Sequence, residues 1–318
     1  MKPEDSSFTL LVAPPTFLDR WRNRVLLVAI LLVPFFVPIP RSLQFHVVIA
    51  EFGDRLHVVL LGGVTFFLYW YGPLRGKLLR SVVAAAIVGG MIELLQTLVG
   101  RHALWHDFFQ DLIGIGIATG FLLWRGKGSR PGLSLMIVLM LLVPYQMREL
   151  PWKVSAVRVC RDRFPLLADF EHPHEKYIWY EEDDSTQHFL VSDEEHGGVQ
   201  RVETGPSDSW PGVVMRRFPN DWTGFNRLLV DIRLTEADRD TVPGGIVISD
   251  FEGLREAAWK TGSFAATRQW QTVGVSLDDL SLDNADRELD ISDIFSLKIF
   301  LSRPTGHTML EIDNLRLE

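Results

Sequence analysis

The chain of 318 residues contains a single cysteine, Cys160, which excludes any intramolecular disulfide. A domain of ordinary size can bury enough apolar surface to fold without such bridges. The sequence also lacks a GxSxG nucleophile motif and the HExxH spacing of a zinc enzyme. These two absences favour a binding protein, while an enzymatic role stays open.

An even distribution of charge is also lacking. Residues up to Arg163 include 18 Lys and Arg against 10 Asp and Glu, whereas the remainder includes 14 against 30. The formal charges are +8 and −16, and most apolar residues lie in the basic part. This asymmetry predicts a membrane region, in contact with a lipid bilayer, joined to an acidic soluble domain. It argues against nucleic acid as a partner, because the acidic part repels phosphate.

Five apolar runs, each bounded by Arg, Lys, Gly or Pro, predict a bundle of five transmembrane helices. They cover residues 25–40, 56–71, 78–99, 108–124 and 133–145. The positive-inside rule places residues 1–24 in the cytoplasm, because the more basic loops lie on their side. After five spans the rest of the chain lies outside the cytoplasm.

Helical periods of useful length are absent after Phe164, where apolar and polar residues alternate. Alternation over residues 227–234, with Leu228, Val230, Ile232 and Leu234 apolar, is typical of a half-buried strand. It recurs over residues 245–251, 270–277, 295–301 and 309–317. About eight to ten short strands predict an all-β jelly-roll sandwich over residues 166–318, after a linker over residues 148–165. The expected class is an α + β membrane protein of two domains.

Several polar residues in the predicted helices would be costly in contact with lipid. They are Asp54, His57, Glu93, Gln96, Arg101, Asp107 and Asp111. Spacings of three or four place pairs on one helix face, and five spans bring all seven to the outer side. We therefore expect one outward polar site. Gly116 and Gly120, four residues apart, predict close helix packing.

Two other interpretations of these polar residues stay open. Buried ion pairs such as Asp54–Arg101 or Glu93–His57 would hold the bundle together. Alternatively, His57 with Glu93, Asp107 and Asp111 would ligate a metal ion, since imidazole and carboxylate are competent donors.

The segments GDRLHVVLLGG and GGMIELLQTLVGR, followed by Asp107 and Gly114, resemble the VanZ-like family of small membrane proteins. The resemblance covers roughly residues 25–145, and we assign residues 25–147 to this domain. The family pattern matches at Asp54, His57, Glu93, Gln96, Arg101 and Asp107. Asp111 stands where the family usually has Asn, so this chain adds a charge. The resemblance implies a multi-pass protein of the bacterial inner membrane with no agreed activity.

The segments LLADFEHP, DWTGFNRLLVDIRL and LEIDNLRL resemble carbohydrate-binding modules of the galactose-binding-like jelly-roll type. The resemblance implies binding of an envelope or extracellular glycan, because aromatic rings cover the C–H face of a pyranose. Trp179, Trp210 and Trp259 are the candidates, since each lies in a turn-rich or polar stretch. We expect Trp222 and Trp270, beside predicted strands, to pack inside.

The same resemblance implies a structural Ca²⁺ between the first and last strands. Glu171 in DFE and Asp313 in IDN stand at the matching positions, and carboxylate oxygens suit calcium. Two carboxylates alone are too few for a six- to eight-coordinate ion, so backbone carbonyls would have to complete the site.

Our interpretation is a membrane-anchored protein that displays a glycan-binding sandwich. One alternative is a membrane enzyme or transporter for a lipid-linked envelope precursor, with Glu93 and His57 as acid and base. Another is a purely structural assembly protein. Glycoside hydrolysis would need a carboxylate pair flanking a cleft, and the sequence identifies none.

Overall fold

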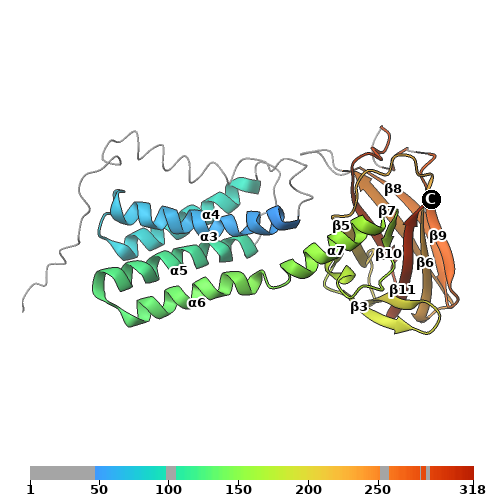
Figure 1. Cartoon of the computed structure of the whole chain (residues 1–318), viewed down its shortest axis with the longest axis horizontal. Helices are drawn as coiled ribbons and strands as arrows, with labels where there is room; N and C mark the ends of the chain where they lie inside the picture. The colour runs from blue at the N-terminus through green and yellow to red at the C-terminus, as the bar shows by residue number, and fades with distance from the viewer. Residues whose placement is uncertain (1–46, 98–104, 251–257, 280, 284–286) are drawn as a thin grey trace, which may run out of the picture. The chain divides into compact units, whose positions relative to one another are not determined.

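A computed structural model describes residues 47–97, 105–250, 258–279, 281–283 and 287–318 (Figure 1). The described chain divides into two compact units, a helical unit that ends at Arg148 and a second unit over Glu149–Glu318. The first predicted membrane helix, residues 25–40, lies outside the described residues, as does Arg101.

Four helices form the described part of the helical unit, and they lie side by side in Figure 1. They are α3 (Val47–Trp70), α4 (Leu78–Thr97), α5 (Trp105–Lys127) and α6 (Arg130–Gln146). The turn between α5 and α6 is short because Gly128 adopts a positive φ of 61°. Ser129 then caps α6 by accepting a hydrogen bond from the Gly132 N–H at 3.2 Å.

Glycines determine how closely these helices approach. A Cβ atom on Gly114 of α5 would lie 2.1 Å from the carbonyl oxygen of Val58 on α3. A Cβ atom on Gly120 would lie 2.6 Å from the carbonyl oxygen of Gly132 on α6. The prediction that Gly116 and Gly120 serve close packing is confirmed, since a Cβ on Gly116 would lie 2.4 Å from Leu139 of α6.

Three segments among the described residues are long and apolar enough to cross a membrane, judged by length and composition alone. They are Leu78–Leu95, Asp107–Lys127 and Arg130–Arg163. The count is therefore three, and the prediction of five is wrong for the described chain. Helix α3 is not among them, because Glu51, Asp54, Arg55 and His57 occupy its N-terminal half and shorten its apolar run.

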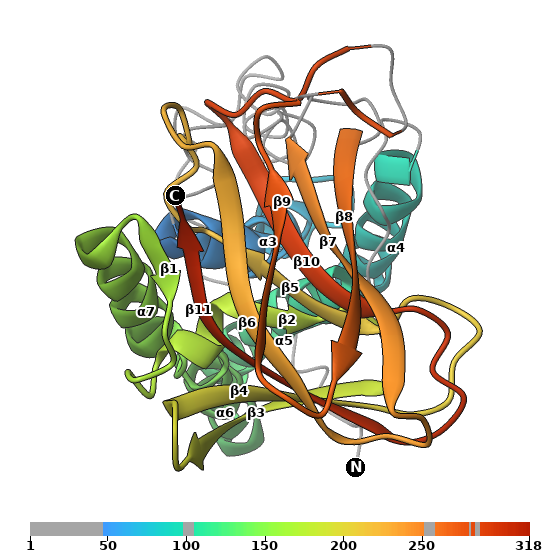
Figure 2. The same cartoon turned by 90° about the vertical axis from the view of Figure 1, so that its right-hand side faces the viewer.

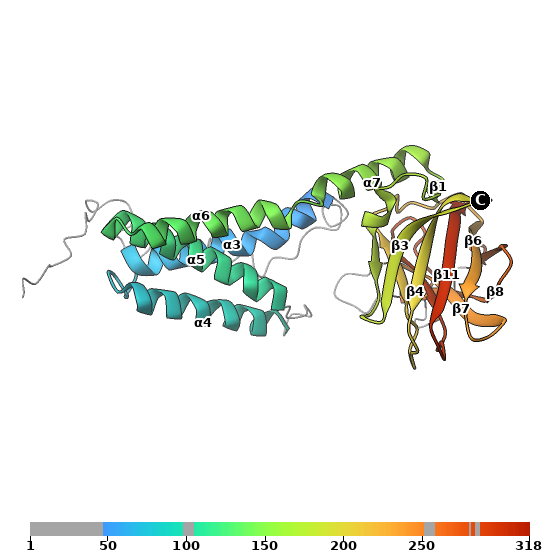
Figure 3. The same ribbon diagram turned by 90° about the horizontal axis from the view of Figure 1, so that it is seen from below.

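The second unit contains a β-sandwich, as the alternating pattern predicts. Sheet A has the order β3-β4-β11-β6-β9, with β1 beside β11, and sheet B has the order β2-β5-β10-β7-β8. Figure 3 shows β3, β4, β11 and β6 of sheet A next to one another. Sheet A contains β1 (Leu166–Ala168), β3 (Thr186–Asp193), β4 (Gly197–Thr204), β6 (Arg227–Glu236), β9 (Gln271–Ser276) and β11 (Thr308–Leu317). Sheet B contains β2 (Trp179–Glu181), β5 (Gly212–Arg216), β7 (Thr241–Asp250), β8 (Ala258–Thr267) and β10 (Ile294–Leu301).

Apolar side chains at alternate positions of the strands fill the space between the sheets. Leu297, Ile299 and Leu301 of β10 are buried, as are Leu228 and its alternate neighbours on β6. Trp222 is fully buried in the same core, as predicted. Because successive side chains of a strand point to opposite faces, the residues between these core positions lie on the outer faces of the two sheets.

Helix α7 (Leu150–Arg163) belongs to the sandwich unit, although the sequence placed these residues in a linker. Ala156 and Cys160 enter the sandwich core, and α7 lies beside β1 (Figure 2). The Ser155 hydroxyl also lies 3.0 Å from Nδ1 of His174. The apolar stripe of α7 consists of small residues one turn apart, so it produces little helical pattern in the sequence.

A fragment over Glu149–Glu318 should therefore be more stable than one over residues 166–318. Loss of Ala156 and Cys160 from the core should lower the free energy of unfolding by roughly 2–3 kcal/mol. Urea unfolding of the two fragments, followed by tryptophan fluorescence, measures the difference. Equal stability would show that α7 contributes nothing to the sandwich.

Candidate functional site

The outer face of sheet B carries a set of small, polar and aromatic side chains. Strand register places on one surface Ser296, Lys298 and Phe300 of β10, Gly245, Val247 and Ser249 of β7, and Trp259, Thr261 and Ser263 of β8. Val214 and Gly212 of β5, and Tyr180 of β2, continue the same surface on the other side of β10. We call this surface the B face.

Phe300 lies between two glycines at the centre of the B face. Gly212 of β5 and Gly245 of β7 are its direct cross-strand neighbours. A Cβ atom on Gly245 would lie 2.6 Å from Cζ of Phe300, so the phenyl ring lies across this glycine. The glycines thus let an aromatic ring lie on the sheet surface instead of standing between neighbouring side chains.

Trp210 and Trp259 extend this aromatic surface in two directions. The Leu301 N–H donates to the Pro211 carbonyl at 2.9 Å, and the Arg303 N–H donates to the Ser209 carbonyl at 3.0 Å. These bonds continue the β5–β10 pairing beyond Gly212, so Trp210 lies two residues before Gly212 on the same side of the sheet. Trp210 and Trp259 are 53% and 39% exposed, respectively. The register places Phe300 and Trp259 on a diagonal of the face. The continued pairing of Ser209–Pro211 with Leu301–Arg303 puts Trp210 at the other end of the same diagonal.

Polar groups border the aromatic rings. Nζ of Lys298 lies 3.2 Å from a carboxylate oxygen of Glu182 and 5.6 Å from the centre of the Phe300 ring. The hydroxyl groups of Ser249 and Ser296 are 2.6 Å apart. Such a surface combines ring faces for stacking with hydrogen-bonding groups at their edges, which suits a molecule with both C–H and hydroxyl surfaces.

Two of the tryptophan predictions are wrong. Trp179 is only 3% exposed, because it opposes Met215 on the core side of sheet B, so its ring offers no external platform. Trp270 is half-buried and does not enter the core. Its ring stacks on His196 at 4.0 Å, and the Arg233 guanidinium carbon lies 4.8 Å from its centre.

The outer face of sheet A is a charge network centred on Glu311. One carboxylate oxygen of Glu311 accepts from Arg201 at 2.7 Å, and the other accepts from Arg233 at 2.7 Å. Arg233 also donates to Asp193. Glu311 is almost completely buried, so this network joins β4, β11 and β6 and leaves little polar capacity for a ligand.

Glu171 and Asp313, the residues at the implied calcium positions, each have a nitrogen partner. The Glu171 carboxylate accepts from the Gly198 N–H at 2.9 Å, and Asp313 is 2.8 Å from Nδ1 of His196. These contacts occupy one oxygen of each carboxylate, while Oδ1 of Asp313 is buried without a hydrogen-bond partner among the described residues, so a calcium site here stays a prediction. Burial raises the pKa of Asp313, while the hydrogen bond with His196 opposes that rise. In the part of the chain that the structure describes, the one cluster of three metal-ligating side chains lies elsewhere.

That cluster is in the helical unit and joins three of the predicted polar residues. Nδ1 of His57 on α3 lies 3.0 Å from Asp111 on α5 and 3.7 Å from Glu93 on α4. Asp107 lies on α5 one turn before Asp111. The Glu93–His57 pair is present as predicted. The structure describes the backbone of Asp54 and Gln96 but not their side chains. The convergence of all seven polar residues therefore stays a prediction.

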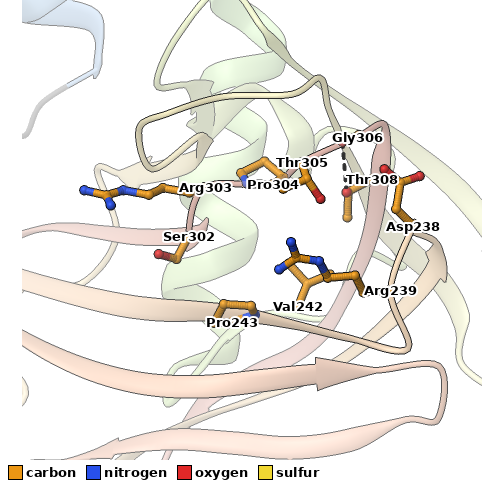
Figure 4. Close-up of a pocket in the computed structure, with 10 residues that line it drawn as sticks. All are labelled: Asp238, Arg239, Val242, Pro243, Ser302, Arg303, Pro304, Thr305, Gly306 and Thr308. Carbon is orange, nitrogen blue, oxygen red and sulfur yellow. Dashed lines mark hydrogen bonds between the residues drawn. The ribbon is translucent and has the colours of Figure 1, made fainter.

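A small pocket lies at the end of the sandwich, between the segment that leads into β7 and the loop after β10 (Figure 4). It is lined by Asp238, Arg239, Val242, Pro243, Ser302, Arg303, Pro304, Thr305, Gly306 and Thr308. Its free volume of about 10 Å³ has room for a single water molecule. A sugar ring does not fit there.

Phe300, Lys298 and Tyr180 belong to the B face but were not among the residues predicted to bind a glycan. A signal existed for two of them, because Leu297, Ile299 and Leu301 alternate with Lys298 and Phe300. An aromatic residue at an outward position of a predicted strand is a candidate for binding. Tyr180 lies in a strand of three residues, which is too short for such a pattern.

No family model matches the chain, and no curated protein matches it. The sandwich is similar to solved carbohydrate-binding modules. A family 11 module from Clostridium thermocellum in complex with a β-1,3-1,4-mixed-linked tetrasaccharide is 20% identical, with a TM-score of 0.38 over 48% of this chain and 93% of that one. The family 11 module of the cellulase Lic26A-Cel5E from the same organism is 19% identical, with a TM-score of 0.37 over 48% and 92%. An exo-β-agarase is 17% identical, with a TM-score of 0.39 over 48% and 24%.

Replacement of Glu311 by Gln should destabilise the sandwich without loss of a ligand site. The two guanidinium groups would face each other without their shared carboxylate, at a cost of about 2 kcal/mol, because both arginines keep partial access to water. Urea unfolding of the Glu149–Glu318 fragment and its E311Q variant measures this loss. An unchanged midpoint would show that the network does not stabilise the sheet.

Proposed function

We propose that the sandwich binds an extended glycan chain on the B face. The observation that carries the proposal is the diagonal of Trp210, Phe300 and Trp259, with small residues between the rings and charged groups beside them. The C–H face of a pyranose ring stacks on an aromatic ring, while its hydroxyl groups reach the polar border.

The spacing of the three rings favours a chain of several sugars over a single one. Neighbouring strands are about 4.8 Å apart and alternate residues about 6.8 Å apart, so Trp210 lies roughly 8 Å from Phe300. By the same geometry Phe300 lies roughly 17 Å from Trp259. A monosaccharide would contact one ring, whereas a linear polysaccharide would contact all three.

Replacement of Phe300 or Trp259 by Ala should weaken glycan binding by roughly tenfold each, which corresponds to about 1.4 kcal/mol of lost stacking. The Glu149–Glu318 fragment contains the whole sandwich core, so it is the form to measure. A glycan array of bacterial and plant polysaccharides identifies a ligand, and calorimetry with each variant gives the change in affinity.

Phe189 provides the matched control, because it is an aromatic residue 41% exposed on β3 of sheet A. F189A should bind the glycan as the parent fragment does. Equal weakening in F189A and F300A, or a folded fragment that binds no glycan on the array, would contradict the proposal.

We further propose that the helical unit anchors the sandwich in a bacterial inner membrane, with Glu149–Glu318 outside the cytoplasm. Two described segments of the helical unit, Leu78–Leu95 and Asp107–Lys127, have the length and composition of membrane spans, and a third, Arg130–Arg163, begins in this unit and continues into α7. Large apolar side chains such as Leu79 and Leu94 on α4, and Val138 and Leu141 on α6, are exposed. So much exposed apolar surface is unfavourable in water and natural in lipid. The resemblance to VanZ-like proteins agrees with this placement.

The full chain should remain in the membrane pellet after alkaline carbonate washing, because apolar helices hold it in the bilayer. Protease added to intact spheroplasts should degrade the sandwich, since the proposal places it outside the cytoplasm. Immunoblotting with an antibody against the sandwich measures both results. Release by carbonate would contradict the anchor, and protection from protease in intact spheroplasts would contradict the orientation.

A further inference from the structure

The polar cluster of the helical unit is formed by one side chain from each of three helices. His57 of α3, Glu93 of α4 and Asp111 of α5 are 8%, 7% and 0% exposed. One ligand atom from each of the three lies within 4.8 Å of the other two. Residues 36 and 18 positions apart in the sequence thus meet at one point, which requires the helices to be packed closely there.

Two glycines make this meeting possible. A Cβ atom on Gly89 of α4 would lie 2.6 Å from Oδ2 of Asp111, so a larger residue there would displace the carboxylate from its present position. Gly114, three residues after Asp111 on α5, allows α5 to approach the backbone of α3 at Val58, next to His57. The close helix packing therefore fixes the positions of these ligand atoms as well as the bundle.

The charges of the cluster point to a cation. Two carboxylates and one imidazole are enclosed together, with one ligand atom of each within 4.8 Å of the others. Within the described residues, Oδ2 of Asp111 has no hydrogen-bond partner although it is buried. A buried carboxylate oxygen without a hydrogen-bond partner is unfavourable, and a bound cation would satisfy it.

We propose that His57, Glu93 and Asp111 bind one divalent transition-metal ion. Ligand atoms around such an ion, each about 2.0–2.2 Å from it, lie roughly 3–4 Å apart. The distances of 3.0 Å and 3.7 Å from Nδ1 of His57 to the two carboxylates agree with this spacing. Oδ2 of Asp111 supplies a further oxygen on the same residue.

The ligand types select the class of metal. Imidazole nitrogen favours Zn²⁺, Fe²⁺ or a related transition metal over Ca²⁺ and Mg²⁺, which prefer oxygen alone. Three protein residues leave at least one coordination position for water or another small ligand. Asp111, the residue by which this chain departs from the VanZ-like pattern, provides the second carboxylate. The site is independent of the glycan-binding face.

Cobalt(II) is a suitable probe, because its visible absorption reports on bound ligands. The purified full chain in detergent, freed of metal with a chelator and dialysed, should bind one equivalent of Co²⁺, and elemental analysis should show that Zn²⁺ displaces it. H57Q and D111N should each weaken binding at least tenfold, since each removes a ligand. H57Q should also change the absorption spectrum, because it removes the single nitrogen donor.

D107N is the matched control, since it removes the same charge as D111N from the same helix, one turn away. It should keep one equivalent of Co²⁺ and the parent spectrum. If D111N does not fold, as judged by circular dichroism, E93Q and H57Q provide the same test. A folded parent chain with no saturable binding of Co²⁺ or Zn²⁺ would overturn the proposal, as would unchanged binding in H57Q. The cluster would then be a hydrogen-bonded network that only packs the bundle.

Discussion

The side chains of β10 alternate between the two surfaces of sheet B, and both the core and the B face depend on this alternation. β10 lies between β5 and β7, so both of its edges are paired. Leu297, Ile299 and Leu301 fill the core, and a shift of one residue in register would expose all three. The same alternation therefore fixes Lys298 and Phe300 on the B face.

Glycines have a comparable role in both units, because each proposed site depends on a close approach that a larger residue would prevent. Gly245 lets the Phe300 ring lie across the sheet, and Gly89 leaves room for Asp111 beside α4. In neither case does glycine bind a ligand. It removes a side chain so that a neighbouring group reaches the position its chemistry requires.

The sequence was sufficient to predict the sandwich, because burial on one side of each strand imposes a period of two that is visible in β6, β7, β10 and β11. The pairing of His57 with Glu93 was one of the interpretations that the sequence left open, and the structure brings the two side chains to 3.7 Å. The errors have a common origin, since the face of a short or terminal strand residue depends on pairing with distant strands. Trp179 is buried because it opposes Met215, and Trp270 stacks on His196; neither partner is identifiable from local sequence. Helix α7 was not predicted, because its buried residues are small and give little apolar periodicity.

The two outer faces of the sandwich differ in what remains free to bind. On sheet A, Glu311, Arg201 and Arg233 satisfy one another, whereas the B face exposes aromatic rings with polar groups at their edges. Chemical-shift mapping by NMR tests this difference most directly, with ¹⁵N-labelled Glu149–Glu318 titrated with the glycan that it binds best. The account predicts shift changes confined to β5, β10, β7 and β8 and largest near Phe300. Changes centred on β3, β4, β11 and β6 would contradict it.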